Sequence, residues 1–251
     1  MLFDRANGKF SLLAAKGGFS FNAAAALISC GGCANDHKVL ITGGWDGYDV
    51  FPYAELYDPV SHTFIEIANM NEARAFHTAT ALNDGTILIA GGSGDATAEI
   101  YDPVAETFTL TSALYHGTGS DMVITLSSHT ATLLGDGTVL IAGGVNCDAA
   151  TQLGEPGCHS VSSASIYDPK TGIFTPTSNA MQSARQNHTA TLISGTTLAG
   201  QVLLSGGDNY SSEADVPLST ADLYNPATRS FTATLSDMST ARTQHAAAQI
   251  P

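Results

Sequence analysis

The chain has 251 residues, enough to bury a large core in a single all-β domain. Only 13% of the residues are charged, against about 25% in an ordinary soluble domain, and acidic residues dominate, with 23 Asp and Glu against 9 Lys and Arg. Such a surface repels nucleic acids and anionic membranes, and no apolar stretch approaches the roughly 20 residues of a membrane span, so we expect neither nucleic-acid binding nor membrane insertion.

The first patterned stretch is "LFDRANGKF", in which Phe3 and Phe10 stand seven residues apart. The same spacing recurs four times downstream, between a tyrosine followed by Asp-Pro or Asn-Pro and a later phenylalanine. The four pairs are Tyr57 and Phe64, Tyr101 and Phe108, Tyr167 and Phe174, and Tyr224 and Phe231. Each pair predicts two strands that are joined by a short turn.

Upstream of each pair lies a short apolar run that ends in two glycines, as in "TVLIAGG". The glycines are Gly43 and Gly44, Gly91 and Gly92, Gly143 and Gly144, and Gly206 and Gly207. A continuous apolar run predicts a strand buried on both faces, and the glycines permit a positive φ or a close approach of another backbone. Alternating "HTATLL" and the Asp136-Gly137 turn predict one more strand before the run. Each repeat thus predicts four strands, and no segment has helical periodicity.

This pattern resembles the Kelch repeats of β-propellers, in the double glycine, the two aromatic residues and an "AR..H" segment before three of the first strands. Two departures are visible: phenylalanine replaces the family's usual tryptophan in the fourth strand, and Leu126 replaces the arginine before His129. The resemblance implies an all-β propeller of four-stranded blades. We expect four complete blades at residues 19–70, 74–115, 126–181 and 185–238, and a partial blade split between residues 1–18 and 242–251.

The partial blade has too few strands to be complete, and a propeller buries its sheet edges by closing. We therefore expect the chain to be a stretch of a longer propeller. A ring closed from the two terminal pieces is the alternative.

Strand direction alternates within a blade, which places tight turns on one face and the longer second-to-third and blade-to-blade loops on the other. Variable loops on a rigid scaffold are common recognition sites. Acidic residues in these loops predict a negative face: Asp46, Asp49, Asp95, Asp148, Glu155, Asp208, Glu213 and Asp215. We expect a protein or carbohydrate ligand to bind this face through Trp45, Asp46, Tyr48, Asp49, Tyr53, Arg74, Arg185, Asp208, Asn209 and Tyr210. Packing of the aromatic residues against a neighbouring blade is the alternative.

Two sets of residues could bind a metal, and for both we favour another role. Asp208, Asn209, Glu213 and Asp215 lack the ordered ligand spacing of a calcium loop. His77, His129, His188 and His245, aligned with Asn22 in the first copy, recur at one position of the first strand. We expect these histidines, and the arginines three residues earlier in three copies, to tie neighbouring blades together by hydrogen bonds. The prediction includes no cofactor.

Four cysteines in two close pairs are candidates for disulfides, which form in an oxidising compartment. A bond between Cys147 and Cys158 would close the longest loop. For Cys30 and Cys33 a local disulfide and two free thiols are both open. The stretch shows no signal peptide, because Asp4 and Arg5 stand where its apolar centre would lie. The paired cysteines nevertheless favour a secreted or cell-surface protein.

These observations favour a non-enzymatic binding module, with other domains of a longer chain as further partners. The resemblance also raises the copper radical oxidases similar to galactose oxidase, in which a Tyr-His pair at the start of a blade binds copper. The residues before the four histidines are Phe76, Ser128, Asn187 and Gln244, so that tyrosine is missing from each copy. The alternatives are a fragment of such an oxidase with catalytic residues elsewhere, and a structural blade array in a large surface protein.

Overall fold

The computed structural model describes residues 2–4, 9–11, 21–92, 97–114, 125–147, 157–195, 197–210 and 214–249. Within these ranges every regular element is a β-strand, and no helix is long and apolar enough to cross a membrane. The all-β prediction is confirmed.

Four antiparallel four-stranded sheets form the body of the molecule, and each draws its strands from one of the four predicted blade ranges. Blade 1 contains β3 (Ala24–Leu27), β4 (Val39–Thr42), β5 (Ala54–Asp58) and β6 (Thr63–Glu66). Blade 2 contains β7 (Thr78–Ala81), β8 (Ile87–Ala90), β9 (Ala98–Asp102) and β10 (Thr107–Leu110). Blade 3 contains β11 (Thr130–Leu133), β12 (Val139–Ala142), β15 (Ala164–Asp168) and β16 (Ile173–Pro176). Blade 4 contains β17 (Thr189–Leu192), β18 (Val202–Ser205), β21 (Ala221–Asn225) and β22 (Ser230–Ala233).

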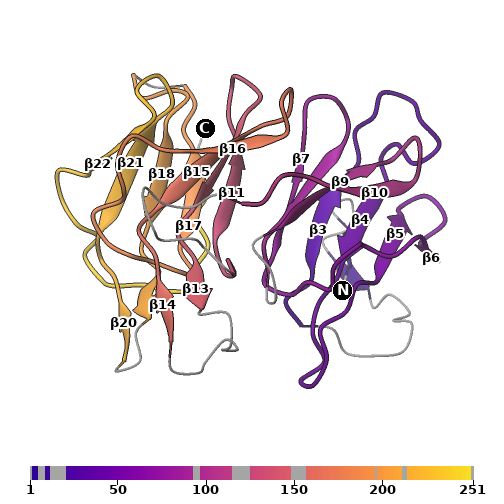
Figure 1. The fold of residues 1–251 in the computed structure, drawn as a ribbon, viewed down its shortest axis with the longest axis horizontal. Helices are drawn as coiled ribbons and strands as arrows, with labels where there is room; N and C mark the ends of the chain where they lie inside the picture. The colour runs from indigo at the N-terminus through magenta and orange to yellow at the C-terminus, as the bar shows by residue number, and fades with distance from the viewer. Residues whose placement is uncertain are drawn as a thin grey trace.

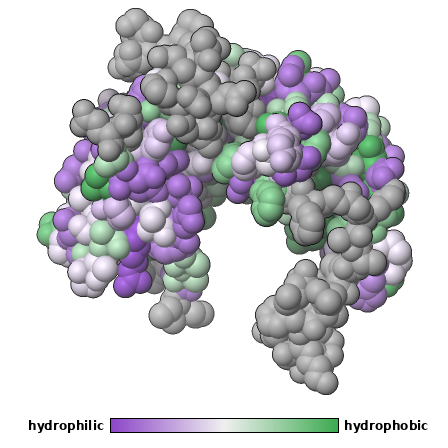
Figure 2. Space-filling model, turned by 90° about the horizontal axis from the view of Figure 1, so that it is seen from below, coloured by the Kyte–Doolittle hydropathy of each residue, from purple (hydrophilic) through white to green (hydrophobic). Residues whose placement is uncertain are grey.

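The first strands of the blades lie innermost. Strand β3 contacts β7, β7 contacts β11, and β11 contacts β17, so consecutive blades stand side by side along one line (Figure 1). Seen from below, the molecule curves around a hollow, so the row of blades is an arc (Figure 2). Near the N-terminus, β1 (Leu2–Asp4) pairs with β2 (Lys9–Ser11), with Phe3 opposite Phe10.

The hydrophobic core lies between the blades. All residues of β8 and β12 are buried, as their unbroken apolar runs predict. One core cluster joins Leu88 of blade 2 to Leu126 and Ile141 of blade 3, and similar clusters fill the spaces between blades 1 and 2 and between blades 3 and 4. The tyrosine and phenylalanine seven residues apart face each other across the third and fourth strands, with ring centroids 4.7–5.1 Å apart. Each blade therefore depends on its neighbours to bury its faces.

The double glycines connect each blade to the segment that leads into the next one, which we call the lead-in. Gly143 has a φ of 62°, and a Cβ there would collide with the carbonyl oxygen of Arg185. The next amide, from Gly144, donates a hydrogen bond to that same oxygen at 2.8 Å. The other three double glycines repeat this contact at 2.7 Å, with the carbonyls of Arg74, Leu126 and Arg242. The glycines recur because the joint leaves no space for a side chain.

Two hairpins were predicted only as loops. Strand β13 (Val145–Cys147) pairs with β14 (Cys158–Ser160), and β19 (Asp208–Tyr210) pairs with β20 (Asp215–Pro217). They extend from the second-to-third connections of blades 3 and 4 at the lower edge in Figure 1, and β14 contacts β19. We call the edge that carries these hairpins, the 45–53 loop and the lead-ins the loop face, and the opposite edge, with its tight turns, the turn face.

Candidate binding site

Five residues form a ladder around the inner end of the blades. Each one has a positive φ of 51–59°, and the first four lie two residues before the first strand of a blade. Each of the last four donates its amide hydrogen to the carbonyl of its counterpart one blade earlier, at 2.9–3.2 Å. These hub residues are Asn22, Phe76, Ser128, Asn187 and Gln244. The left-handed region is uncommon for residues other than glycine. The ladder hydrogen bonds hold five different side chains at one structural position.

The ladder corrects the alignment of the first copy. Asn22 was aligned with the histidines, but Ala24 pairs with Thr42 as Thr78 pairs with Ala90. Ala23 therefore occupies the histidine position, and Asn22 is the counterpart of Phe76. The slip arose because "FNAAAAL" and "FHTATAL" match when aligned on the phenylalanine, and only strand register separates the two alignments.

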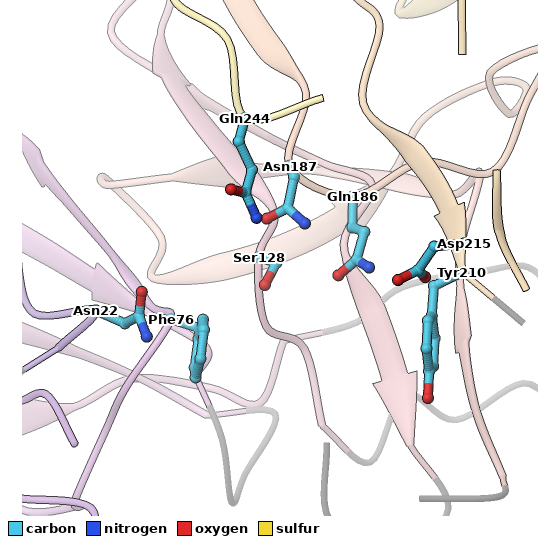
Figure 3. A pocket seen from close by; sticks show the side chains of 8 residues that line it. All are labelled: Asn22, Phe76, Ser128, Gln186, Asn187, Tyr210, Asp215 and Gln244. Atoms are coloured by element: carbon cyan, nitrogen blue, oxygen red, sulfur yellow. The ribbon is translucent and has the colours of Figure 1, made fainter. Parts of the chain in front are cut away.

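A cavity of about 490 Å³ opens at the hub and is lined by all five hub residues (Figure 3). Three more residues complete its wall on the side of blade 4: Gln186, Tyr210 and Asp215. Four of the eight lining side chains are carboxamides, two are aromatic, and one, Asp215, is charged at neutral pH. The lining contains no basic side chain. Its volume falls in the range of ligand pockets, about 300–1,000 Å³.

Asp208 lies behind the cavity wall and is only 4% exposed. Its Oδ2 accepts a hydrogen bond from Gln186 Nε2 at 2.7 Å, and its Oδ1 accepts one from Asn187 Nδ2 at 3.2 Å and another from the Thr243 hydroxyl. The carboxylate predicted to face a ligand thus orients two cavity side chains from inside. Its calcium-binding alternative also involved Glu213, which lies outside the described residues. In the described ranges, no three His, Cys, Asp or Glu residues are arranged to hold a metal ion.

The 45–53 loop presents its aromatic residues on the loop face. Tyr48 is 92% exposed and Tyr53 is 58% exposed, and the Tyr53 ring stacks on Phe51 with centroids 5.2 Å apart. Asp46 Oδ1 accepts hydrogen bonds from the Tyr48 and Asp49 amides at 2.9 Å, which fixes the turn and lowers the pKa of Asp46. Trp45 is half-buried, and its backbone forms a β-bridge with Phe21. The loop thus combines a partly packed tryptophan with two exposed tyrosines.

The remaining described residues of the predicted binding set lie on strand β19 of the blade 4 hairpin. Asn209 is exposed on β19, and Tyr210 is half-buried against Val145 and the second disulfide. Asp95, Asp148 and Glu155 lie outside the described residues.

Arg74 and Arg185 do not reach the loop surface, and their inclusion in the binding set is corrected. They are 1% and 0% exposed. Arg74 donates to Gly91 O at 2.7 Å and pairs with Glu99 at 2.9 Å. Arg185 donates to Gly206 O at 2.6 Å and pairs with Asp222 at 2.8 Å. Each guanidinium braces its own blade from inside, as Arg does when its planar fork meets several acceptors.

The recurrent histidines tie adjacent blades together. Nε2 forms a hydrogen bond to a threonine hydroxyl of the preceding blade, at 2.9 Å for His129 with Thr78 and for His188 with Thr130, and at 3.3 Å for His245 with Thr189. Burial lowers the pKa of His77 to about 3, that of His129 to about 4 and that of His188 to about 3, so these rings are neutral at pH 7. The geometry supports the predicted structural role of the histidines.

The joint between blades 1 and 2 forms the same hydrogen bond with a different threonine. Blade 1 has Ala24 where the other blades have threonine, and Thr42, directly opposite Ala24, provides the hydroxyl for His77 at 2.9 Å. The residues that match Thr42 in blades 2 and 3 are Ala90 and Ala142. The hydroxyl has moved across the strand pair without loss of the contact.

Both cysteine pairs form disulfides. Cys147 and Cys158 face each other directly on β13 and β14, so the disulfide closes the last residue pair of the two strands, at the end away from the blade. Cys30 and Cys33 close a turn whose Asn35 donates to Pro103 O at 3.1 Å and to Glu106 at 2.7 Å, on the turn of blade 2. The local disulfide, one of two alternatives, therefore shapes a contact between blades 1 and 2.

Comparisons with known proteins agree with this architecture. A family model described as Kelch motif matches residues 27–71. A Kelch repeat and BTB domain-containing protein of Caenorhabditis elegans is 28% identical over 166 residues, which cover 63% of this chain and 25% of the relative. The Kelch repeat-containing protein kel-10 of the same organism is 27% identical with the same coverage. The chain spans about a quarter of the length of these relatives.

A solved structure of a fungal alcohol oxidase, described as having catalytic diversity among the AA5 family and as a complex with copper, is similar in fold. Its TM-score is 0.55 at 17% identity, and the match covers 96% of this chain and 58% of the oxidase chain. At this identity the similarity concerns the fold alone.

Proposed function

Because this chain is built from Kelch repeats folded as propeller blades, we propose that it is a non-enzymatic interaction module of a secreted or cell-surface protein. The module presents the loop face to a protein or glycan partner. The observation that carries the proposal is the 45–53 loop, which holds Tyr48 and Tyr53 exposed on a defined turn. Tyrosine supplies a large contact area at a low cost in conformational entropy, and it is enriched among residues that dominate binding energy.

The distribution of charge supports a basic or neutral partner. The exposed carboxylates of the described loop face include Asp46, Asp49, Asp215 and Asp237. The turn face carries exposed groups of both signs, with Lys170 and Arg229 beside Asp84, Glu106 and Asp136. Arg242, in the last lead-in, is the exposed basic residue of the described loop face. A net charge of −14 adds a long-range attraction for cations. The two disulfides support an oxidising compartment.

We do not extend the oxidase activity of the fungal neighbour to this chain. The hub residues that precede the four histidines lack a phenol, and the Nε2 atom of each histidine forms a hydrogen bond with a threonine hydroxyl inside a joint. Those imidazoles serve the connection between blades.

The test is a binding screen with the 251-residue chain against arrays of extracellular proteins and of glycans. Any partner that binds should lose at least tenfold in affinity when Tyr48→Ala and Tyr53→Ala are combined, because two exposed contact residues are removed. Val104→Ala, which truncates a 72% exposed residue on the turn face, is the matched control and should bind unchanged. Equal binding by both variants would contradict the proposed face.

A further inference from the structure

We propose that the hub cavity accepts a guanidinium group, the arginine side chain of a peptide partner. The inference deepens the proposed function, on which it rests for the nature of the partner. It depends on how the carboxamides of the cavity wall are oriented and on which charges surround them.

Asp208 determines which atoms Gln186 and Asn187 show to the cavity. A carboxylate accepts hydrogen bonds and donates none, so the NH₂ group of each carboxamide must face Asp208. The carbonyl oxygen of each side chain then points the other way. In Figure 3 these two oxygens lie on the side of Ser128, over the cavity. Gln186 is only 8% exposed. In the described part of the chain, no hydrogen bond engages its Oε1 or the Oδ1 of Asn187.

The cavity wall near blade 4 is therefore rich in acceptors. Besides the two fixed carbonyl oxygens it contains the exposed Asp215 carboxylate and the Ser128 hydroxyl. A ligand that satisfies this wall must donate several hydrogen bonds, and a positive charge strengthens each of them. An anionic ligand meets no basic group in the lining. Among the described residues, no hydrogen bond fixes the side-chain amides of Asn22 and Gln244. These amides can turn to present either a donor or an acceptor to a ligand.

Guanidinium fits this wall better than ammonium does. Its five N–H donors lie in one plane and reach several acceptors at once, whereas an ammonium group acts as a point charge. Its flat face also stacks on aromatic rings, and Phe76 and Tyr210 stand on opposite sides of the cavity (Figure 3). The hub positions are held in the left-handed region, and strain of this kind is often found at ligand sites.

The test uses three short peptides, each acetylated and amidated, that differ in one central side chain: arginine, citrulline or lysine. Citrulline keeps the planar shape of arginine and removes its charge. Binding to the ¹⁵N-labelled chain is followed by NMR, through the side-chain amide signals of Gln186 and Asn187. We expect the arginine peptide to bind at least tenfold more tightly than the citrulline peptide, and more tightly than the lysine peptide. Equal affinity for arginine and citrulline, equal affinity for arginine and lysine, or no binding at all would overturn the proposal.

Two variants locate the binding. Asp215→Asn should weaken the arginine peptide about tenfold. Asp208→Asn lets the amides turn over, so it should reduce the preference for arginine over citrulline. Asp102→Asn is the matched control for charge, because it lies on the turn face and blade 4 already has Asn225 at the corresponding position. An equal loss in all three variants would show a diffuse charge effect and overturn the site.

The outcome also separates the two proposals. If no arginine peptide binds while Tyr48→Ala with Tyr53→Ala abolishes binding of a screened partner, the interaction module stands and the guanidinium site falls. If the arginine peptide binds and no partner depends on the two tyrosines, the loop proposal falls and the cavity remains.

Discussion

The lead-ins of blades 3 and 4 perform one structural task with opposite chemistry. In blade 4, Arg185 pairs with Asp222, and both are at most 1% exposed. In blade 3 the same two positions are Leu126 and Ser165, both 0% exposed, and Leu126 joins the hydrophobic core. The backbone carbonyl at this position accepts the same glycine hydrogen bond in both cases. The glycine-to-carbonyl hydrogen bond is therefore the same in both blades. The two side chains beside it differ together, from Arg185 with Asp222 to Leu126 with Ser165.

The largest expected effect comes from breaking that unit. Arg185→Leu leaves the Asp222 carboxylate buried without its cation, and we expect a loss of about 3–5 kcal/mol in the free energy of unfolding. Adding Asp222→Ser recreates the pair found in blade 3 and should recover most of the loss. Urea unfolding followed by circular dichroism measures both. If the double variant is no more stable than Arg185→Leu, the two lead-ins are not equivalent.

Acid should weaken the joints of both kinds. The usual histidine pKa of 6.5 applies to the unfolded chain, while burial holds the pKa of His77, His129 and His188 at about 3 to 4 in the fold. The unfolded chain thus binds more protons below pH 6.5, so stability is complete above this pH and falls as the pH decreases toward the folded values. At pH 5.5 the buried histidines together cost on the order of 4 kcal/mol of stability, shared about equally among the three.

Unfolding at pH 7.5 and 5.5 checks this value, and His129→Gln should remove about a third of the pH dependence. NMR titration sharpens the comparison of the lead-ins. After burial, the charge of Arg74 lowers the pKa of His77 and that of Arg185 lowers the pKa of His188, whereas His129 follows Leu126. His129 should therefore protonate at the highest pH of the three. Identical titration of all three would contradict the role of the arginines.

Substitution of the first glycine tests the contact that both lead-ins share. Gly143→Ala places a Cβ against the Arg185 carbonyl and the His188 ring, and Gly91→Ala does the same against Leu126 and His129. We expect losses of about 3 kcal/mol for both, of which about 1 kcal/mol is the left-handed conformation alone. Gly172→Ala, with φ of 68° and open space around it, isolates that conformational part. A much smaller loss in Gly91→Ala than in Gly143→Ala would show that the backbone joints differ.

The smallest effect concerns the histidine ties. Thr130→Val removes the hydroxyl that bonds to His188, and it should cost about 1 kcal/mol in the free energy of unfolding. Thr132→Val, two residues further on the same face of β11, is the matched control for the change of side chain. Equal losses in the two variants would indicate that the tie contributes nothing of its own.

The sequence predicts the repeated part of this fold well because each repeated residue has a local reason. The double glycines, the paired aromatics and the Asp turns follow from backbone conformation and strand pairing, and all appear where expected. The hairpin of β13 and β14 was not predicted, because strands of three residues show too little periodicity. The two cysteines indicated a closed loop but not that its ends pair as strands. Asn22 was placed one residue off because a run of alanines provides no register signal.

The cavity escaped prediction for a different reason. Its lining residues come from five separate copies of the repeat, and the hub position varies from copy to copy, so no local motif marks it. The binding set predicted from loops contained Tyr210 but not Gln186 or Asp215. It also contained Arg74 and Arg185, because long basic side chains are usually exposed. Their burial is explained by the acidic partners on the third strands, Glu99 and Asp222.

The glycine-to-carbonyl joint also sets how the molecule comes apart. Each joint links one blade to the next and to no other, so cohesion passes between nearest neighbours, as in a linear repeat array. Residues 242–249 at the C-terminal end of the arc are held, among the described contacts, by blade 4 and its lead-in alone, through Gly207, Asn187, Thr189 and Ser194. Amide hydrogen exchange in the 251-residue chain should consequently be fast in residues 242–249 and slowest in β8 and β12, the fully buried strands of the two middle blades.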